Sequence, residues 1–228
     1  MNTCISRHNL SISRYVLRFG SFVMMRPAPI HTLPDGYSEA RHWQLDAVWL
    51  ILFNVIALLP LAISIALVTG WVYVVGQLRG DSFNVGAGFP LWIGLVLLLA
   101  TLGLHEWLHG LPMQLVGHKP RYGVKWRKMV LYTTADDALF RRGEYLVVLL
   151  SPLIGITLLG MFLIAVFFTS GVAFYIALAV ILNGTSSIGD LWMTGIVLQY
   201  PSTALIRDEA EGIRIYTTLE TSGSVTGN

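Results

Sequence analysis

A long apolar stretch, residues 90–116, reads PLWIGLVLLLATLGLHEWLHGLPMQLV. It is long enough to cross the roughly 30 Å hydrocarbon core of a bilayer as a helix. Its one acid, Glu106, stands between His105 and His109. Histidines four residues apart share a helix face, which suits two imidazole ligands of one Zn²⁺ ion, and the glutamate between them can serve as a general base. The stretch therefore predicts a metal site placed in the membrane.

Composition and hydropathy predict a membrane protein. Of the 228 residues, 54% are hydrophobic and 12% are charged, against about 25% charged residues in soluble domains. Four stretches are long and apolar enough to span a bilayer, namely 47–75, 89–115, 145–168 and 172–200. We expect an all-α membrane protein with four transmembrane helices.

Two short β-hairpins are expected beside these helices. Residues 121–134, between the second and third predicted spans, contain two runs rich in β-forming residues, and we expect a short cytoplasmic hairpin there. Residues 203–217 predict a short β-like hairpin near the C-terminus. The role of the 121–134 hairpin is left open, because its tryptophan and lysines could simply anchor the loop among lipid headgroups.

Basic residues indicate the orientation in the membrane. They are concentrated before the first predicted span and between the second and the third: Arg7, Arg14, Arg18, Arg26, Arg41, Lys119, Arg121, Lys125, Arg127, Lys128, Arg141 and Arg142. Because basic loops stay on the cytoplasmic side, we expect a multi-pass protein of the cell membrane with both termini in the cytoplasm. The net charge is only +2, and no nucleic-acid partner is implied. The single cysteine, Cys4, leaves nothing for an internal disulfide or a thiolate metal cluster.

The expected domain organisation has three parts. Residues 1–32 are an N-terminal arm, disordered or amphipathic, 33–217 form a single membrane-embedded metallopeptidase-like domain, and 218–228 are a disordered tail. The first residue of the protein is left open between Met1 and Met24 or Met25.

The end of the second predicted span carries a proline and a glycine. Pro112 lacks the amide hydrogen that would bond the carbonyl of Leu108, so we expect the helix to kink or loosen there. Gly117 supplies a helix stop. The metal-binding face of the helix would then open toward the cytoplasm.

A catalytic zinc ion takes three protein ligands and keeps an open position. Asp190 is the best third ligand, because it and Glu106 are the acids of the four predicted spans that lie away from the membrane boundary. At 1.5 Å per helical residue, Asp190 and His109 differ in depth by roughly 6 Å. The rival acids and histidine are explained by interfacial pairing or by solvation in a loop: Glu144, Asp136, Asp137 and His118. A helix-packing role for Asp190, bonded to nearby serines, stays open.

A polar stripe surrounds the third ligand. Asn183, Ser187 and Asp190 follow an i, i+4, i+7 pattern and share one helix face. Asn183 is therefore a candidate catalytic residue that donates a hydrogen bond to a carbonyl oxygen as negative charge develops there. Hydrogen bonding between helices explains Asn183 equally well, and it explains Ser186 and Ser187 better.

These residues resemble a known group of enzymes. The group is the site-2 protease class of intramembrane zinc metallopeptidases, and the likeness is closer to the small bacterial putative zincin peptidases catalogued as a domain of unknown function. It rests on the HEWLH string at 105–109, the later segment 183–190, the loop 117–123 and the segment 144–152. It covers about residues 33–217.

The resemblance implies specific roles. His105, His109 and Asp190 would hold one zinc ion, and Glu106 would be the general base. It also implies that the 121–134 hairpin pairs with an unwound substrate strand. The aspartate of site-2 proteases is usually followed by glycine, whereas here Gly189 precedes it, which weakens the inference of the same substrates.

The sequence thus favours a membrane-embedded zinc metallopeptidase that cuts a membrane protein or peptide at or within the bilayer. The alternative is a non-catalytic adaptor or binding protein in which zinc staples two helices together. A transporter is disfavoured, because the chain shows no repeated half. The substrate and the oligomeric state stay open.

Overall fold

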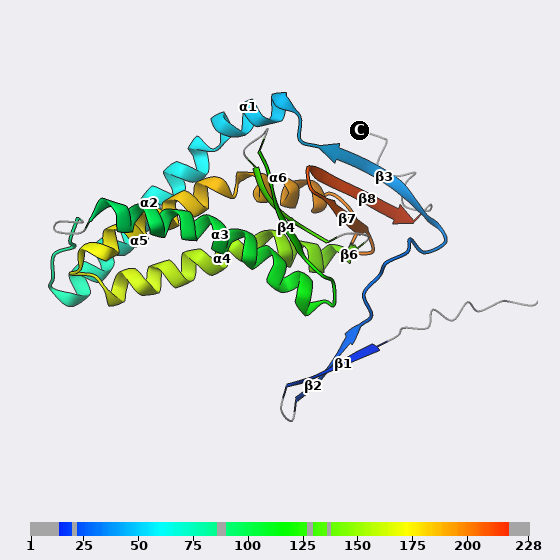
Figure 1. Cartoon of the computed structure of the whole chain (residues 1–228), viewed down its shortest axis with the longest axis horizontal. Helices are drawn as coiled ribbons and strands as arrows, with labels where there is room; N and C mark the ends of the chain where they lie inside the picture. Colours follow the sequence, from blue (N-terminus) through cyan, green and yellow to red (C-terminus); the bar gives the residue numbers. More distant parts are fainter. Residues whose placement is uncertain (1–13, 20–21, 86–89, 127–129, 136–137, 219–228) are drawn as a thin grey trace, which may run out of the picture.

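The computed structural model describes residues 14–19, 22–85, 90–126, 130–135 and 138–218. Six helices lie within these residues: α1 Ala47–Ile56, α2 Leu58–Arg79, α3 Leu91–Leu115, α4 Arg142–Val166, α5 Gly171–Ser186 and α6 Ile188–Val197. The described strands are β1 Arg14–Phe19, β2 Phe22–Pro27, β3 Tyr37–Gln44, β4 Arg121–Lys125, β5 Val130–Thr134, β6 Leu139–Arg141, β7 Leu205–Glu209 and β8 Gly212–Thr218. Figure 1 shows α2 to α5 side by side at one end of the molecule and the strands β3, β8, β7 and β6 at the other.

The all-α prediction is wrong, because a four-stranded antiparallel sheet lies against the helices. Its order is β3-β8-β7-β6. The predicted hairpins at 121–134 and 203–217 exist as β4–β5 and β7–β8. The second of them is extended by a strand from before α1 on one side and by a strand from before α4 on the other.

The strands β3 and β6 escaped the sequence analysis for a physical reason. Most residues of β3 are polar or partly exposed, and Trp43 is its one buried residue. Its backbone groups are satisfied by β8, about 170 residues later in the chain. The three residues of β6 are too few to show an alternating pattern. Pairing over such separations leaves little local trace.

The prediction of four transmembrane helices is also wrong. Three helical segments are long and apolar enough to cross a membrane: 47–79, 91–115 and 142–166. The first of these is α1 followed by α2, which are separated at Ala57. The predicted span 172–200 is instead two helices, α5 and α6, bent by 40° relative to each other.

The break between α5 and α6 falls in the polar patch. The hydroxyls of Ser186 and Ser187 lie 3.0 Å and 2.9 Å from the carbonyl oxygen of Asn183. Side chains that bond a carbonyl within the same helix compete with the helical ladder and favour a bend. The bend turns α6 so that Asp190, in its first turn, faces α3.

α3 does not end at Pro112. The helix continues through the proline to Leu115, and Gly117 then adopts a positive φ of 95°, as expected for a helix stop. The loss of the helical hydrogen bond is compensated locally, because the hydroxyl of Ser151 in α4 lies 2.8 Å from the freed Leu108 carbonyl oxygen.

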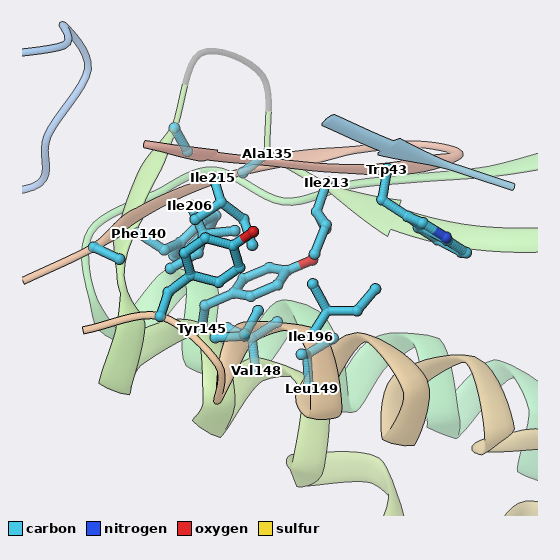
Figure 2. Packing of buried hydrophobic residues seen from close by; sticks show 14 of the residues in the cluster. Trp43, Ala135, Phe140, Tyr145, Val148, Leu149, Ile196, Ile206, Ile213 and Ile215 are labelled. Carbon is cyan, nitrogen blue, oxygen red and sulfur yellow. The ribbon is translucent and has the colours of Figure 1, made fainter. Parts of the chain in front are cut away.

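Three clusters of buried hydrophobic residues hold the described elements together, and two of them include helices. Buried residues of α2, α4 and α5 pack at the helical end, including Val68, Ile164 and Val180. The second core lies between the sheet and the helices α3, α4 and α6. Figure 2 shows Tyr145 and Val148 of α4 facing the isoleucines of β7 and β8. This second core fixes the sheet over the end of the bundle that carries the histidines.

We expect Gly94→Ala to lower the thermal stability of the protein. A Cβ at Gly94 would lie 2.2 Å from a ring carbon of Tyr175 on α5, so the ring or one of the helices must move. Overpacking of this kind costs about 1–3 kcal/mol. A thermal melt in detergent measures it, with Gly103→Ala as the control, because no atom lies within 4 Å of that position on the same helix. Equal melting temperatures for the two variants would contradict the close α3–α5 contact.

Candidate metal centre

Three predicted ligands converge from α3 and α6. His105 Nε2 lies 3.3 Å from Asp190 Oδ2, and His109 Nε2 lies 3.4 Å from Asp190 Oδ1. One ligand atom from each residue can be chosen so that all lie within 4.8 Å of one another. All three residues are buried, with 8% of each surface exposed. They lie close enough to bind one metal ion.

The geometry and chemistry of the three side chains fit zinc. Tetrahedral ligands at the Zn–N and Zn–O distance of about 2.0–2.1 Å lie about 3.3 Å apart, close to the two separations measured from Asp190. The Oδ2 atom of Asp190 is buried and makes no hydrogen bond. A buried carboxylate oxygen without a partner is costly, and a cation between the three side chains would satisfy it.

The backbone of α4 sets the orientation of His109. Its Nδ1 lies 2.8 Å from the carbonyl oxygen of Val148. A carbonyl only accepts, so Nδ1 carries the hydrogen, which leaves Nε2 as the ring nitrogen that can ligate a metal. The Val148 carbonyl is available because Pro152, four residues later, has no amide hydrogen to donate to it. A proline in α4 thus provides the acceptor for a histidine in α3.

Asn183 sets the orientation of His105 in the same way. Asn183 Oδ1 lies 2.9 Å from His105 Nδ1, and its Nδ2 donates to the carbonyl oxygen of Pro152 at 3.3 Å. The second contact fixes which end of the amide faces the imidazole. His105 therefore donates through Nδ1 and keeps Nε2 for a metal. Both ends of the Asn183 amide are therefore in contact with the protein, and Asn183 does not line the cavity described below, so we interpret it as a residue that supports a predicted ligand.

The β4–β5 hairpin holds Glu106. The hydroxyl oxygen of Thr133 in β5 lies 2.8 Å from Glu106 Oε2 and 2.9 Å from the Glu106 backbone oxygen. Tyr122 of β4 packs against Gly110 of α3. The contact requires glycine, because a Cβ at Gly110 would lie 2.0 Å from the hydroxyl oxygen of Tyr122. The hairpin is thus docked on α3 beside the HEWLH string.

A cavity of about 290 Å³ adjoins the three ligands. Its wall includes His105, Glu106, His109 and Asp190, and it continues between β5, the β7–β8 turn, α1 and α6. Ligand pockets usually have volumes of roughly 300–1,000 Å³. The metal centre therefore borders a space that can admit part of a small molecule or peptide.

A polar pair that the sequence did not indicate lies in the same cavity, with Tyr145 buried and Asp208 half-buried. Tyr145 of α4 donates a hydrogen bond of 2.6 Å to Asp208 Oδ1 of β7, and both residues line the cavity. Burial raises the pKa of Asp208 to about 6, against the opposing effect of the hydrogen bond from Tyr145. Asp208 lies about 100 residues after the HEWLH string, so the sequence gives no sign that the two are close. The pairing of β7 in the sheet brings Asp208 to the cavity.

The rival ligands lie elsewhere. Glu144 accepts from the backbone amide of Arg141 and pairs with its guanidinium at 2.9 Å, as expected for an interfacial pair at a helix start. His118 packs between the rings of His31 and Phe140, and burial lowers its pKa. Asp136 and Asp137 lie outside the described residues.

Comparison with known proteins gives one partial match to a family. Residues 98–205, just under half of the chain, match the model of a family described as "Putative zincin peptidase". The matched segment includes His105, Glu106, His109, Asn183 and Asp190. No curated protein and no solved structure matches the chain. The match supports a zincin-like family and, with it, a zinc-dependent peptidase; the likeness to site-2 proteases stays a prediction.

We expect the purified protein to bind one zinc ion per chain and the Asp190→Ala variant to lose it on dialysis, because two imidazoles alone leave the site short of a ligand. Asn183→Ala should weaken zinc binding about 10- to 100-fold, the usual effect of removing a residue that supports a ligand. Mass spectrometry of bound metal and a zinc titration measure both. His31→Ala, an exposed histidine away from the site, should keep full occupancy, and retention of zinc by Asp190→Ala would exclude this set of ligands.

Asp208 should make the metal-free protein less stable as the pH rises from about 4 to about 6. The folded-state pKa, about 6, lies above the ordinary value of 3.8, so the unfolded chain releases its proton first. The difference is worth about 3 kcal/mol at most. The free energy of unfolding of wild type and of Asp208→Asn is measured across this pH range. The comparison separates the titration of Asp208 from that of the histidines, which both proteins share. The stability of Asp208→Asn relative to wild type should increase with pH; a constant difference would show that the carboxyl titrates normally.

Proposed function

We propose that this chain is a membrane-embedded zinc metallopeptidase that hydrolyses peptide bonds at or within the membrane. The observation that carries the proposal is the convergence of His105, His109 and Asp190 on one point, with Glu106 beside them at the wall of a cavity. The family match supports the peptidase activity. The position of both histidines in an apolar helix supports action in the bilayer.

The chain's own residues can perform each part of the hydrolysis. His105, His109 and Asp190 would hold zinc, which supplies a Lewis acid that activates water and polarises a carbonyl group. Glu106 takes a proton from the attacking water and passes it to the leaving nitrogen. Thr133 is a positioning residue, since its hydroxyl holds one carboxylate oxygen of Glu106.

We assign Asn183 a positioning role in place of the carbonyl-donor role expected from the sequence. Both ends of its amide are used within the protein, by His105 and by the Pro152 carbonyl. Its removal would act through the orientation of an imidazole.

The β5 edge supports a peptide as the substrate. In the described residues β5 pairs with β4 only, and Leu131, Tyr132 and Thr133 of β5 line the cavity. An unpaired strand edge can bind an extended peptide through backbone hydrogen bonds. A substrate strand laid along β5 would pass Glu106 and the three ligands, which agrees with the role implied by the resemblance to site-2 proteases.

The substrate would be a membrane protein or membrane-anchored peptide. The histidines lie in the later part of α3, near the basic loop that we expect on the cytoplasmic side. We therefore place the reaction toward the cytoplasmic side of the cell membrane, with both termini of the enzyme in the cytoplasm. The alternative, a zinc staple without catalysis, requires a closed fourth coordination position, and the cavity beside the ligands favours the enzyme.

Glu106→Gln should abolish peptide cleavage while leaving zinc bound. Loss of a general base costs about 10²- to 10⁴-fold in rate, and Gln keeps the size of the side chain. Thr133→Val should reduce kcat by a smaller factor with little change in zinc content. The assay is cleavage of membrane-anchored peptides in liposomes, with Thr203→Val, an exposed position, as the control. Equal product formation by wild type and Glu106→Gln would remove Glu106 from the reaction.

A further inference from the structure

The cavity at the metal centre has an apolar wall and a polar wall. The apolar wall comes from β3, α1 and α6, and it includes Trp43, Leu50, Phe53 and Met193. The polar wall comes from β5 and the β7–β8 turn. The metal ligands lie between the two walls, so a molecule at the metal centre meets both.

The apolar wall is held in place by aromatic contacts. Trp49 of α1 lies with its ring centroid 4.6 Å from that of Trp192 of α6, and Trp43 of β3 lies 6.3 Å from Phe53. These contacts attach α1, which has no buried residue of its own, to the sheet and to α6. The wall is therefore built from three separate segments and is formed before a ligand arrives.

Trp43 of this wall is buried, but the other three side chains are not fully covered. Leu50, Phe53 and Met193 are only partly buried and line the cavity. Apolar surface in such a position gains free energy when an apolar group covers it. Binding of an apolar ligand group against this wall would therefore be favourable.

The polar wall offers little to a charged ligand group. Its three acids are already paired within the protein: Asp208 with Tyr145, Glu209 with Arg214, and Glu211 with Lys125. A basic side chain would have to displace an existing cation at Glu209 or Glu211 and the Tyr145 hydroxyl at Asp208, and an acidic one would be repelled. Selection among ligands therefore falls to the apolar wall.

We propose that this wall, formed by Trp43, Leu50, Phe53 and Met193, is a specificity subsite that takes a large apolar side chain of the peptide beside the scissile bond. The inference rests on the proposed function. Side chains of an extended peptide alternate in direction, so a strand along β5 directs every second side chain away from the hairpin. Phe, Leu and Met are the side chains whose shape and polarity suit the wall.

The first test uses peptides. Zinc-loaded full-length protein in liposomes is given membrane-anchored peptides that differ only in one residue flanking the cleaved bond. We expect kcat/KM to be about 10-fold or more higher with Phe than with Ala at one flanking position, the discrimination typical of an apolar pocket. Equal kcat/KM for Phe and Ala on both sides of the bond would overturn the subsite.

Matched variants of α1 locate the preference. Phe53→Ala should reduce the Phe-to-Ala ratio to near one, and Phe53→Trp should shift the preference toward smaller side chains. Leu52→Ala is the control, because Leu52 is the adjacent residue, is 40% exposed and does not line the cavity. An unchanged ratio in both Phe53 variants, with melting temperatures near that of wild type, would rule out this wall as its source.

The second test does not require peptidase activity. Amino-acid hydroxamates chelate zinc, so binding of phenylalanine hydroxamate and of glycine hydroxamate can be compared by calorimetry in zinc-loaded Glu106→Gln protein. We expect phenylalanine hydroxamate to bind about 10-fold more tightly, and Phe53→Ala to remove the difference. If this preference is found but no peptide is cleaved by wild type, the proposed function fails and the subsite stands. If peptides are cleaved but neither test shows a preference, the subsite alone fails.

Discussion

The structure depends on a buried carboxylate held opposite two imidazoles. Asp190 comes from a helix of ten residues, and the histidines come from a helix of 25 residues. Neither helix alone could keep these side chains away from water, because an unpaired buried carboxylate is costly. The arrangement therefore requires other elements to fix the positions of α3 and α6. The helix α4 fixes the position of α3.

α4 supports the centre through carbonyl groups that prolines set free. Pro152 leaves the Val148 carbonyl for His109, and Pro112 leaves the Leu108 carbonyl for the hydroxyl of Ser151. Inside an apolar bundle a freed carbonyl must find a donor. Each proline therefore creates a requirement that a neighbouring helix meets, and the two contacts fix α3 against α4 beside the metal ligands.

Much of the candidate metal centre could be predicted from the sequence, because the patterns that indicate it involve residues close together in one helix. Helical spacing places His105 and His109 on one face, and an acid deep in an apolar segment, such as Asp190, requires a partner. Half of the sheet was visible as the 203–217 hairpin, but β3 and β6 were not, because they have no clear alternation and obtain their hydrogen bonds from strands far along the chain. Asp208 lies within the predicted hairpin, but the sequence did not show that the hairpin packs beside Tyr145. The role of Asn183 could not be decided from spacing alone, since a helix face does not reveal which neighbour its amide meets.

The sheet and the hairpin give the centre features that a bundle of helices could not supply. A helix satisfies its own backbone groups, so it has no free edge for a peptide, whereas β5 has one within the part of the chain that the structure describes. The same strand holds the carboxylate of Glu106 through Thr133. A peptide that pairs with β5 would therefore restrain Thr133, which contacts the carboxylate proposed as the general base. Under that proposal, recognition of the peptide backbone and alignment of Glu106 depend on one strand, and Glu106 would be best ordered when a substrate strand is in place.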